Sequence, residues 1–237
     1  MNDSQERHNS AAQSPRAFFG RRKGRALRPR QQALFDALLP RLALDTQSKP
    51  PADLRSLFPD GTEDVRLEIG FGGGEHLIAQ ATAHPRTGFI GSDAFVNALA
   101  KVLAAIEAQQ LKNIRLYFGD ALHLIDWLPA ASLARVDLLY PDPWPKRRHW
   151  KRRFIQDASL KQIARVLRPQ GELRFATDIA DYAAWTLIRV LRSTDFCWTA
   201  QKADDWRQPW PSFTGTRYEA KAKRAGRAPC YLIFRRR

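Results

Sequence analysis

The residues that decide the fold form the stretch Val65-Arg66-Leu67-Glu68-Ile69-Gly70-Phe71-Gly72-Gly73-Gly74. Its first half, 65–69, is a short apolar run that predicts a buried strand, and its glycines predict a tight turn into a helix at 75–83. The alternation continues, with strands expected at 87–92, 114–118, 136–140, 172–176 and 231–234 and helices at 95–109, 154–167 and 181–192. This order predicts an α/β fold, a Rossmann-like, doubly wound and mostly parallel sheet with helices on both faces.

The segments outside this pattern are of a different kind. The first dozen residues are polar, and seven cations follow between Arg16 and Arg30 beside Phe18 and Phe19. We interpret 1–30 as a disordered, basic N-terminal arm, with a solvated run of charges as the alternative. A helix is expected from residue 31, ended or kinked by Pro40, and 48–62 reads as a linker. Residues 31–237 are then expected to form one domain, in which 202–226 is a long loop.

Charge and composition limit the possible partners. The 237 residues carry a formal net charge of +15, which attracts polyanions and makes nucleic acid the expected partner. No apolar run approaches the roughly 20 residues of a membrane-spanning helix, and two cysteines are too few for a disulfide framework or a structural zinc site. The five histidines do not pair at metal-ligand spacing. We expect a cytoplasmic protein without a metal or a membrane partner, as a monomer or a weak homodimer.

The glycine turn carries the first chemical signal. Gly70 and Gly72 would let a ligand approach the backbone without meeting a Cβ atom. The pattern G-x-G-G-G differs from the G-x-G-x-x-G of dinucleotide-binding turns. Glu68 would repel a pyrophosphate but favour the positive end of a methionine-type ligand. The turn therefore indicates S-adenosylmethionine as the cofactor, with a purely structural turn as the alternative.

Two further acids lie where strands are expected to end. Asp93 follows the second strand, where folds of this kind place an acid that binds ribose hydroxyls. Asp120 follows the third strand, and we interpret it as an adenine contact. Capping of the next helix is a second, compatible role for Asp120.

The most specific segment follows the fourth strand and reads Pro141-Asp142-Pro143-Trp144-Pro145-Lys146-Arg147-Arg148-His149-Trp150-Lys151-Arg152-Arg153. The flanking prolines stiffen the turn around Asp142, which the edge of the sheet places near the transferable methyl group. Six Lys and Arg residues follow directly and suit phosphates, and Trp144 or Trp150 would stack on a base turned outward. An acid at a strand end joined to a basic cluster indicates a reaction on nucleic acid rather than a solvated charged surface.

This segment resembles the signature of the bacterial tRNA (guanine-N7-)-methyltransferases, a class I family that uses S-adenosylmethionine. Ala176-Thr177-Asp178 and Thr216-Arg217-Tyr218-Glu219 are similar to two later motifs of that family, and the resemblance extends from about residue 16 to the C-terminus. Two positions depart from the family pattern, which has Glu in place of Asp93 and Lys-Phe in place of Arg217-Tyr218. The first substitution keeps an acid, and the second keeps a cation and an aromatic ring.

The resemblance implies a role for each matching residue. The cofactor contacts would be Glu68, Gly70, Gly72, Asp93, Asp120 and Asp142, and Asp142 would also be the catalytic residue. The substrate contacts would be Lys146, Asp178, Thr216, Arg217, Tyr218 and Glu219. The RNA backbone would be bound by Arg148, Lys151, Arg152 and Arg153.

The activity that the resemblance implies is methyl transfer to N7 of the guanine at position 46, in the variable loop of tRNA, which forms 7-methylguanosine. Guanine N7 carries a lone pair and no hydrogen, so a strong general base is unnecessary. The site has to align N7 with the methyl carbon and to offset the positive charge that forms on the purine. Two alternatives are methylation of another RNA base and a non-catalytic RNA-binding protein on the same fold.

Overall fold

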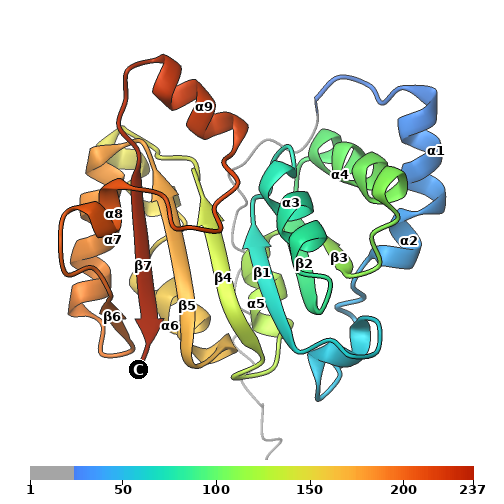
Figure 1. The fold of residues 1–237 in the computed structure, drawn as a ribbon, viewed down its shortest axis with the longest axis horizontal. Coiled ribbons are helices and arrows are strands. Elements are labelled where there is room, and N and C mark those ends of the chain that lie inside the picture. Colours follow the sequence, from blue (N-terminus) through green and yellow to red (C-terminus); the bar gives the residue numbers. More distant parts are fainter. Residues whose placement is uncertain (1–23) are drawn as a thin grey trace, which may run out of the picture.

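The computed structural model describes residues 24–237, which form one seven-stranded sheet with helices on both faces (Figure 1). The strands are β1 (Asp64–Ile69), β2 (Thr87–Asp93), β3 (Ile114–Phe118), β4 (Leu133–Leu139), β5 (Leu167–Thr177), β6 (Phe196–Trp198) and β7 (Cys230–Arg236). Their order across the sheet is β3-β2-β1-β4-β5-β7-β6. β1 to β5 pair in parallel, whereas β7 pairs antiparallel with both β5 and β6. The predicted doubly wound, mostly parallel α/β sheet is confirmed.

Two groups of helices cover the sheet. One group packs over β2 and β3 and comprises α1 (Pro29–Ala37), α2 (Leu39–Leu42), α3 (Glu75–Ala83) and α4 (Val96–Gln109). The opposite face is covered by α5 (Ala121–Trp127), α6 (Asp157–Val166) and α7 (Ala180–Arg192). The short helices η1 (Leu54–Leu57), η2 (Arg147–Arg152), α8 (Asp204–Arg207) and α9 (Arg217–Arg224) lie in the connections.

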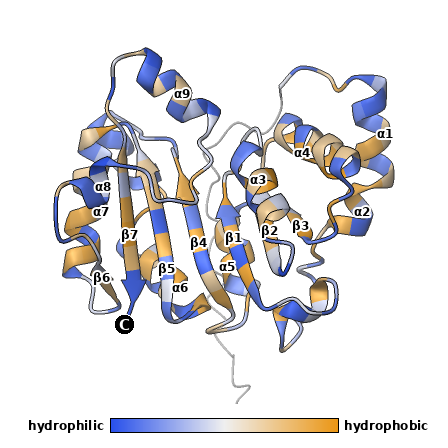
Figure 2. Cartoon of the chain, viewed as in Figure 1, coloured by the Kyte–Doolittle hydropathy of each residue, from blue (hydrophilic) through white to orange (hydrophobic). Residues whose placement is uncertain are grey.

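The pattern of apolar residues explains which surface each element buries. The central strands are buried along most of their length, as expected for strands covered on both faces. α6 buries a single stripe with Leu160, Ile163 and Val166, at the spacing of a helix that is half exposed. Hydrophobic residues dominate β4 and β7, whereas α9 is mostly hydrophilic (Figure 2). The buried apolar residues form separate clusters, of which the two largest pack against α5, α6 and α7 and against α1 to α4, and α9 is a mostly polar helix outside them.

The N-terminal part of the described chain agrees with the sequence in one respect and differs in another. α1 ends at Ala37 and α2 begins at Leu39, with Pro40 in its first turn, so the predicted break is confirmed. The predicted linker at 48–62 contains η1, and its Leu54 and Phe58 pack into the core. The predicted disordered arm falls largely on residues 1–23, which lie outside the described residues.

The prediction of a long loop at 202–226 is wrong, because this stretch contains both α8 and α9. α9 begins at a capping residue: the Thr216 hydroxyl accepts a hydrogen bond from the Glu219 backbone N–H at 3.1 Å. Thr-x-x-Glu is a recognised sequence signal for a helix start. The motif 216–219 therefore has a local structural role as well as any role in binding.

Candidate functional site

The acids predicted for the site gather at one edge of the sheet. Glu68 lies near the end of β1 and Asp93 ends β2, while Asp120, Asp142 and Asp178 follow β3, β4 and β5. Since these strands are parallel, their carboxyl ends meet at the same edge, where ligands of open α/β sheets bind. The structure thus brings five sequence-predicted residues to one place.

The glycine turn after β1 packs closely against the start of α9. Gly70 and Gly72 have φ angles of 69° and 55°, in the left-handed region that favours glycine. A Cβ atom added to Gly72 would lie 3.3 Å from the Arg217 guanidinium and 3.3 Å from the Tyr218 ring. α9 lies above the sheet in Figure 1, beyond the ends of β4 and β5. The substrate motif predicted at 216–219 is therefore adjacent to the cofactor turn predicted at 70–74.

Asp93 joins the glycine turn to the end of β2. Its two carboxylate oxygens accept backbone hydrogen bonds from Gly72 at 2.9 Å and from Phe95 at 2.8 Å. Burial raises the pKa of the Asp93 carboxyl above its ordinary value, and these hydrogen bonds oppose the increase without cancelling it. Asp93 therefore holds the shape of the turn in addition to any contact with a ribose.

Asp120 caps α5, which is the second role that the sequence allowed for it. One of its carboxylate oxygens accepts the Leu122 backbone N–H at 3.0 Å. An acid at the N-terminus of a helix also interacts favourably with the helix dipole. The structure supports the capping role, and the adenine contact stays a prediction.

Glu68 is buried and pairs with a residue of α3. It is 5% exposed, and its Oε2 atom lies 2.8 Å from Nδ1 of His76, which belongs to α3. Burial opposes protonation of His76, but the charge of Glu68 and its hydrogen bond outweigh this effect and raise the pKa of the imidazole. Burial also raises the pKa of the Glu68 carboxyl. The sequence analysis gave His76 no role, and only its position eight residues after Glu68 could have suggested this pair.

The Glu68–His76 pair makes the stability of the protein depend on pH. Because the pKa of His76 is raised, the folded protein binds this proton more tightly than the unfolded chain does. The contribution of His76 to stability is complete below pH 6.5, the ordinary value for histidine, and is lost as pH rises through the folded pKa. We expect the free energy of unfolding, measured by urea titration at several pH values, to fall above pH 6.5 less steeply in His76→Gln than in the wild type.

His84→Gln is the matched control for this experiment. Burial lowers the pKa of half-buried His84. The contribution of His84 to the free energy of unfolding therefore increases as pH rises towards 6.5, which is opposite to the change expected from His76. The His84→Gln variant should keep the wild-type slope above pH 6.5. An identical slope in His76→Gln and the wild type would contradict the assignment of the pair.

A second buried hydrogen-bond network joins β4 to α3 and to the segment before α9. Arg135 in β4 donates to Asp137 at 2.8 Å and to the Gln80 side chain at 2.9 Å. Gln80 in turn donates to the backbone oxygen of Ser212 at 2.6 Å. This chain of hydrogen bonds fixes the segment before α9 to α3 and β4. None of these residues was a candidate in the sequence.

The loop after β4 is constrained on both sides of Asp142. Tyr140 and Trp144 have φ angles of 50° and 44°, which are uncommon for residues with a side chain, and prolines flank Asp142 directly. Asp142 is exposed in the loop, but the atoms around its carboxyl desolvate it enough to raise its pKa. A carboxylate held in a stiff loop at the sheet edge suits contact with a reacting ligand.

The two acids predicted to bind the substrate are already paired with cations. Asp178 accepts a hydrogen bond from Arg227 Nε at 2.6 Å. Glu219 is buried and lies 2.6 Å from the Lys223 ammonium, and the hydroxyl of Tyr231 donates to it at 2.5 Å. These partners, Arg227, Lys223 and Tyr231, were not identified as site residues from the sequence.

The basic segment forms the 3-10 helix η2, and its cations have different surroundings. Lys146, Arg148 and Lys151 are exposed, whereas Arg152 lies over the Trp144 ring, with its guanidinium carbon 5.0 Å from the ring centre. Arg153 is wholly buried, whereas the predicted contact with the RNA backbone would require an exposed guanidinium. Arg153 directly follows η2, and its side chain packs against the rings of Trp150 and Trp185.

The two tryptophans of this segment also pack against protein atoms. The Trp150 ring meets the Trp185 ring edge to face, with ring centres 5.3 Å apart. Trp144 makes a similar contact with His149 at 5.9 Å. Stacking of an RNA base on either ring would therefore require these contacts to rearrange.

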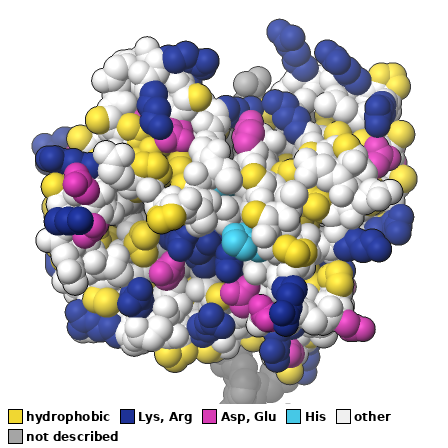
Figure 3. Space-filling view, in the orientation of Figure 1, with side chains coloured by type: hydrophobic (Ala, Val, Ile, Leu, Met, Phe, Trp, Pro, Cys, Tyr) yellow, Lys and Arg dark blue, Asp and Glu magenta, His cyan; other side chains and the backbone are white. Residues whose placement is uncertain are grey.

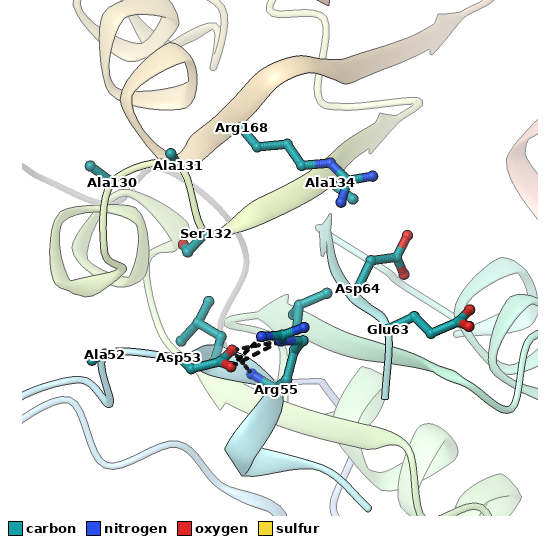
Figure 4. Close-up of a pocket in the computed structure, with 12 residues that line it drawn as sticks. Ala52, Asp53, Arg55, Glu63, Asp64, Ala130, Ala131, Ser132, Ala134 and Arg168 are labelled. Carbon is teal, nitrogen blue, oxygen red and sulfur yellow. Dashed lines mark hydrogen bonds and ion pairs between the residues drawn. The ribbon is translucent and has the colours of Figure 1, made fainter. Parts of the chain in front are cut away.

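A cavity of about 400 Å³ lies at the other edge of the sheet (Figure 4). Its lining includes Asp64 at the start of β1 and Ser132 before β4, together with Arg55 and Arg168. These are the amino ends of the parallel strands, opposite the edge at which the predicted site residues gather. The cavity is therefore separate from the candidate site.

Metal sites and membrane-spanning helices are two further features to consider in residues 24–237. Within this range, no group of three or more His, Cys, Asp or Glu side chains is arranged to hold a metal ion. Among the helices that the structure describes, none combines the length and the apolar character needed to cross a membrane.

Comparison with known proteins agrees with the predicted family. Residues 62–232 match the family described as "Putative methyltransferase". The tRNA (guanine-N(7)-)-methyltransferase of Rhodopseudomonas palustris (strain BisB18) is 59% identical over 237 residues, which are 100% of this chain and 94% of that protein. The enzyme of the same name from Nitrobacter hamburgensis is 60% identical over 220 residues, 93% of this chain and 86% of that protein.

A solved structure shares the fold at low sequence identity. The 16S rRNA methyltransferase KamB superimposes with a TM-score of 0.54 at 14% identity, over 80% of this chain and 95% of that chain. This likeness concerns the fold alone. The identity of nearly 60% along the whole sequence goes further, and by it the chain belongs to the family of tRNA (guanine-N(7)-)-methyltransferases.

Proposed function

We propose that this chain transfers the methyl group of S-adenosylmethionine to N7 of a guanine in the variable loop of tRNA, which forms 7-methylguanosine. The observation that carries the proposal is that the residues of the family motifs meet at one sheet edge, in a chain of which the whole length matches relatives of that name. We also propose that 31–237 form a single domain that follows a basic N-terminal arm, and that the protein is cytoplasmic.

The glycine turn and its neighbours fit S-adenosylmethionine. A Cβ atom added to Gly70 would meet no atom within 4 Å, so the backbone there is open to a ligand. Asp93 at the end of β2 and Asp120 after β3 are suited to the ribose and the adenine, respectively. Glu68 would act through its charge and through His76. When bound, S-adenosylmethionine supplies an electrophilic methyl group on a positively charged sulfur.

Asp142 is the proposed catalytic residue. Methylation of guanine N7 requires no removal of a proton, because N7 has a lone pair and no hydrogen. The side chain therefore acts by charge, offsetting the positive charge that develops on the purine, or by accepting hydrogen bonds from N1 and the exocyclic amine of guanine. The stiff loop around Asp142 keeps its carboxylate in place while the ring becomes positively charged.

The remaining edge of the guanine is proposed to meet residues from three further segments. Lys146 follows the loop of Asp142, Asp178 follows β5, and 216–219 form the first turn of α9. Gly72 lies against Arg217 and Tyr218, which supports a guanine site next to the cofactor turn. Guanine binding at Asp178 or Glu219 would compete with the cations Arg227 and Lys223.

A basic surface supports the tRNA part of the proposal. Lys and Arg side chains project from the regions of α9 and α1 in the view of Figure 3. In α9 the exposed cations are Lys221, Lys223 and Arg224, and Arg25, Arg28 and Arg30 are exposed at the start of the described chain. Together with Arg148 and Lys151 of η2, these residues would neutralise phosphates along the RNA.

Methylation of tRNA transcripts that differ in one atom tests the proposed function. A transcript with 7-deazaguanine in the variable loop keeps every guanine hydrogen-bonding group of the base-pairing edge and replaces N7 by a C–H group. We expect labelled methyl groups to enter the unmodified transcript as 7-methylguanosine, identified by mass spectrometry of the nucleosides, and not to enter the 7-deazaguanine transcript.

The other outcomes separate the alternatives. Equal labelling of both transcripts would overturn the N7 assignment and indicate another RNA base. Absence of labelling together with absence of S-adenosylmethionine binding in calorimetry would indicate a non-catalytic RNA-binding protein.

A further inference from the structure

Arg153 is the most deeply buried cation of the basic segment. It is 0% exposed, and it ranks among the largest fully buried side chains of the described chain. Its guanidinium carbon lies 4.9 Å from the ring centres of Trp150, Tyr182 and Trp185. Three aromatic faces at this distance attract a cation and shield it from water. A phosphate of the RNA cannot reach this guanidinium without disruption of the packing around it.

The polar contacts of Arg153 connect two elements of the candidate site. Its Nε atom donates to the backbone oxygen of Pro143 at 2.8 Å, and Pro143 directly follows Asp142. Its Nη2 atom pairs with the carboxylate of Asp181, in the first turn of α7. Arg153 therefore ties the loop that carries Asp142 to a helix packed against the sheet.

Neighbouring hydrogen bonds hold the backbone around Arg153 in the same way. The side-chain amide of Gln156 donates to the backbone oxygens of Trp150 at 2.8 Å and Arg153 at 3.1 Å. The indole N–H of Trp185 donates to the Ile155 oxygen at 2.8 Å. The segment after η2 is thus fixed independently of any ligand, so it provides a rigid base from which Arg153 reaches the Pro143 carbonyl.

The cations of the segment fall into two groups by burial. Arg153, which directly follows η2, is buried, whereas Arg148 and Lys151 within η2 are exposed. The exposed pair is free to bind phosphates, whereas the inward position is committed to the loop. The same stretch of sequence therefore contains residues for two different tasks.

We propose that Arg153 is a positioning residue, which sets the location of Asp142 through the Pro143 carbonyl, and that it does not bind the RNA. This inference rests on the proposed function, because it assumes that Asp142 acts on the methyl transfer. Loss of the Arg153 contact would let the Asp142 loop shift, and misplacement of a reacting group by about 1 Å costs about 10²-fold in rate.

The test compares Arg153→Met with Lys151→Met in full-length protein. For Arg153→Met we expect kcat for tRNA methylation to fall about 10²-fold, with the KM for tRNA and the salt dependence of tRNA binding unchanged. For Lys151→Met we expect weaker tRNA binding and a slope of log K against log salt reduced by roughly 1. A reduced slope for Arg153→Met, equal to that of Lys151→Met, would overturn the proposal.

Two milder variants distinguish a loss of positioning from a loss of folding. Arg153→Lys keeps a cation among the three rings but loses the forked geometry, so it should recover part of kcat relative to Arg153→Met. Asp181→Ala removes the outer partner, of which the side chain is 56% exposed, and should lower kcat several-fold in a protein that remains folded. Wild-type kcat in both folded variants would also overturn the proposal.

Hydrogen exchange of peptides covering 140–153 separates this inference from the proposed function. We expect faster exchange in Arg153→Met and Asp181→Ala than in the wild type and Lys151→Met, whether or not the protein methylates tRNA. An inactive wild type with this exchange pattern would remove the proposed function and leave the anchoring of the loop in place. An active wild type with unchanged exchange in both variants would remove the positioning role alone.

Discussion

Asp142→Ala is expected to lower the single-turnover rate of methyl transfer to tRNA by about 10²- to 10³-fold, the range found when one preorganised electrostatic contact is removed. The reason is its location: the carboxylate is held between two prolines at the carboxyl end of β4, and Arg153 fixes the following carbonyl. Binding of S-adenosylmethionine should be retained in part, because the glycine turn, Asp93 and Asp120 are unchanged. Rapid-quench measurement of labelled methyl groups gives the rate, and calorimetry gives cofactor affinity.

Asp142→Asn separates the two ways in which Asp142 could act. The amide keeps the size of the side chain and one hydrogen-bond acceptor but removes the negative charge. A rate as low as that of Asp142→Ala would assign the effect to charge, whereas an intermediate rate would assign part of it to hydrogen bonding with guanine. Near-normal turnover in Asp142→Ala would refute the catalytic assignment.

Arg135→Ala is expected to reduce the free energy of unfolding by about 3–5 kcal/mol, the typical cost of removing one partner from a buried ion pair. Arg135 and Asp137 are 5% and 2% exposed, so the substitution leaves a buried carboxylate without its cation. It also removes the hydrogen bond to Gln80, which holds the segment at Ser212. Urea denaturation followed by far-UV circular dichroism measures the change.

Arg55→Ala is the matched control, because Arg55 also pairs with an aspartate two residues away. The Arg55–Asp53 pair is 55% exposed on both sides, so its loss should leave the free energy of unfolding unchanged within error. The double variant Arg135→Met/Asp137→Leu, which removes both charges together, should recover most of the stability lost in Arg135→Ala. Equal effects of Arg135→Ala and Arg55→Ala would show that burial of the pair is unimportant.

The order of strands and helices was predictable because each element has its own periodicity. Short apolar runs gave β1 to β5 and β7, and the helices between the parallel strands followed from the spacing of their apolar residues. β6 has only three residues and was not predicted, because so short a run carries no periodic signal. α9 was taken for a loop because its mostly charged residues obscured the Thr216 cap and its one buried apolar residue, Ala222.

The site was predictable to the level of which residues lie at the sheet edge. Asp93, Asp120, Asp142 and Asp178 lie at the carboxyl edge of the sheet as expected, since a parallel sheet brings its carboxyl strand ends together. The motifs did not show which side chains are turned inward. Glu68 pairs with His76, and Arg153 is buried while Lys151 is exposed, because these orientations depend on helix phase and tertiary packing.

The ion pairs of Asp178 with Arg227 and of Glu219 with Lys223 bear on how a polyanion enters the site. A pocket that presented several bare carboxylates would repel the phosphates of the nucleic acid carrying its target base. In the free protein each of these two carboxylates is neutralised by a neighbouring cation on or just after α9. An approaching strand therefore meets no bare carboxylate at these two positions, and we expect the two acids to become available to the base only when their cations exchange partners, from carboxylate to phosphate.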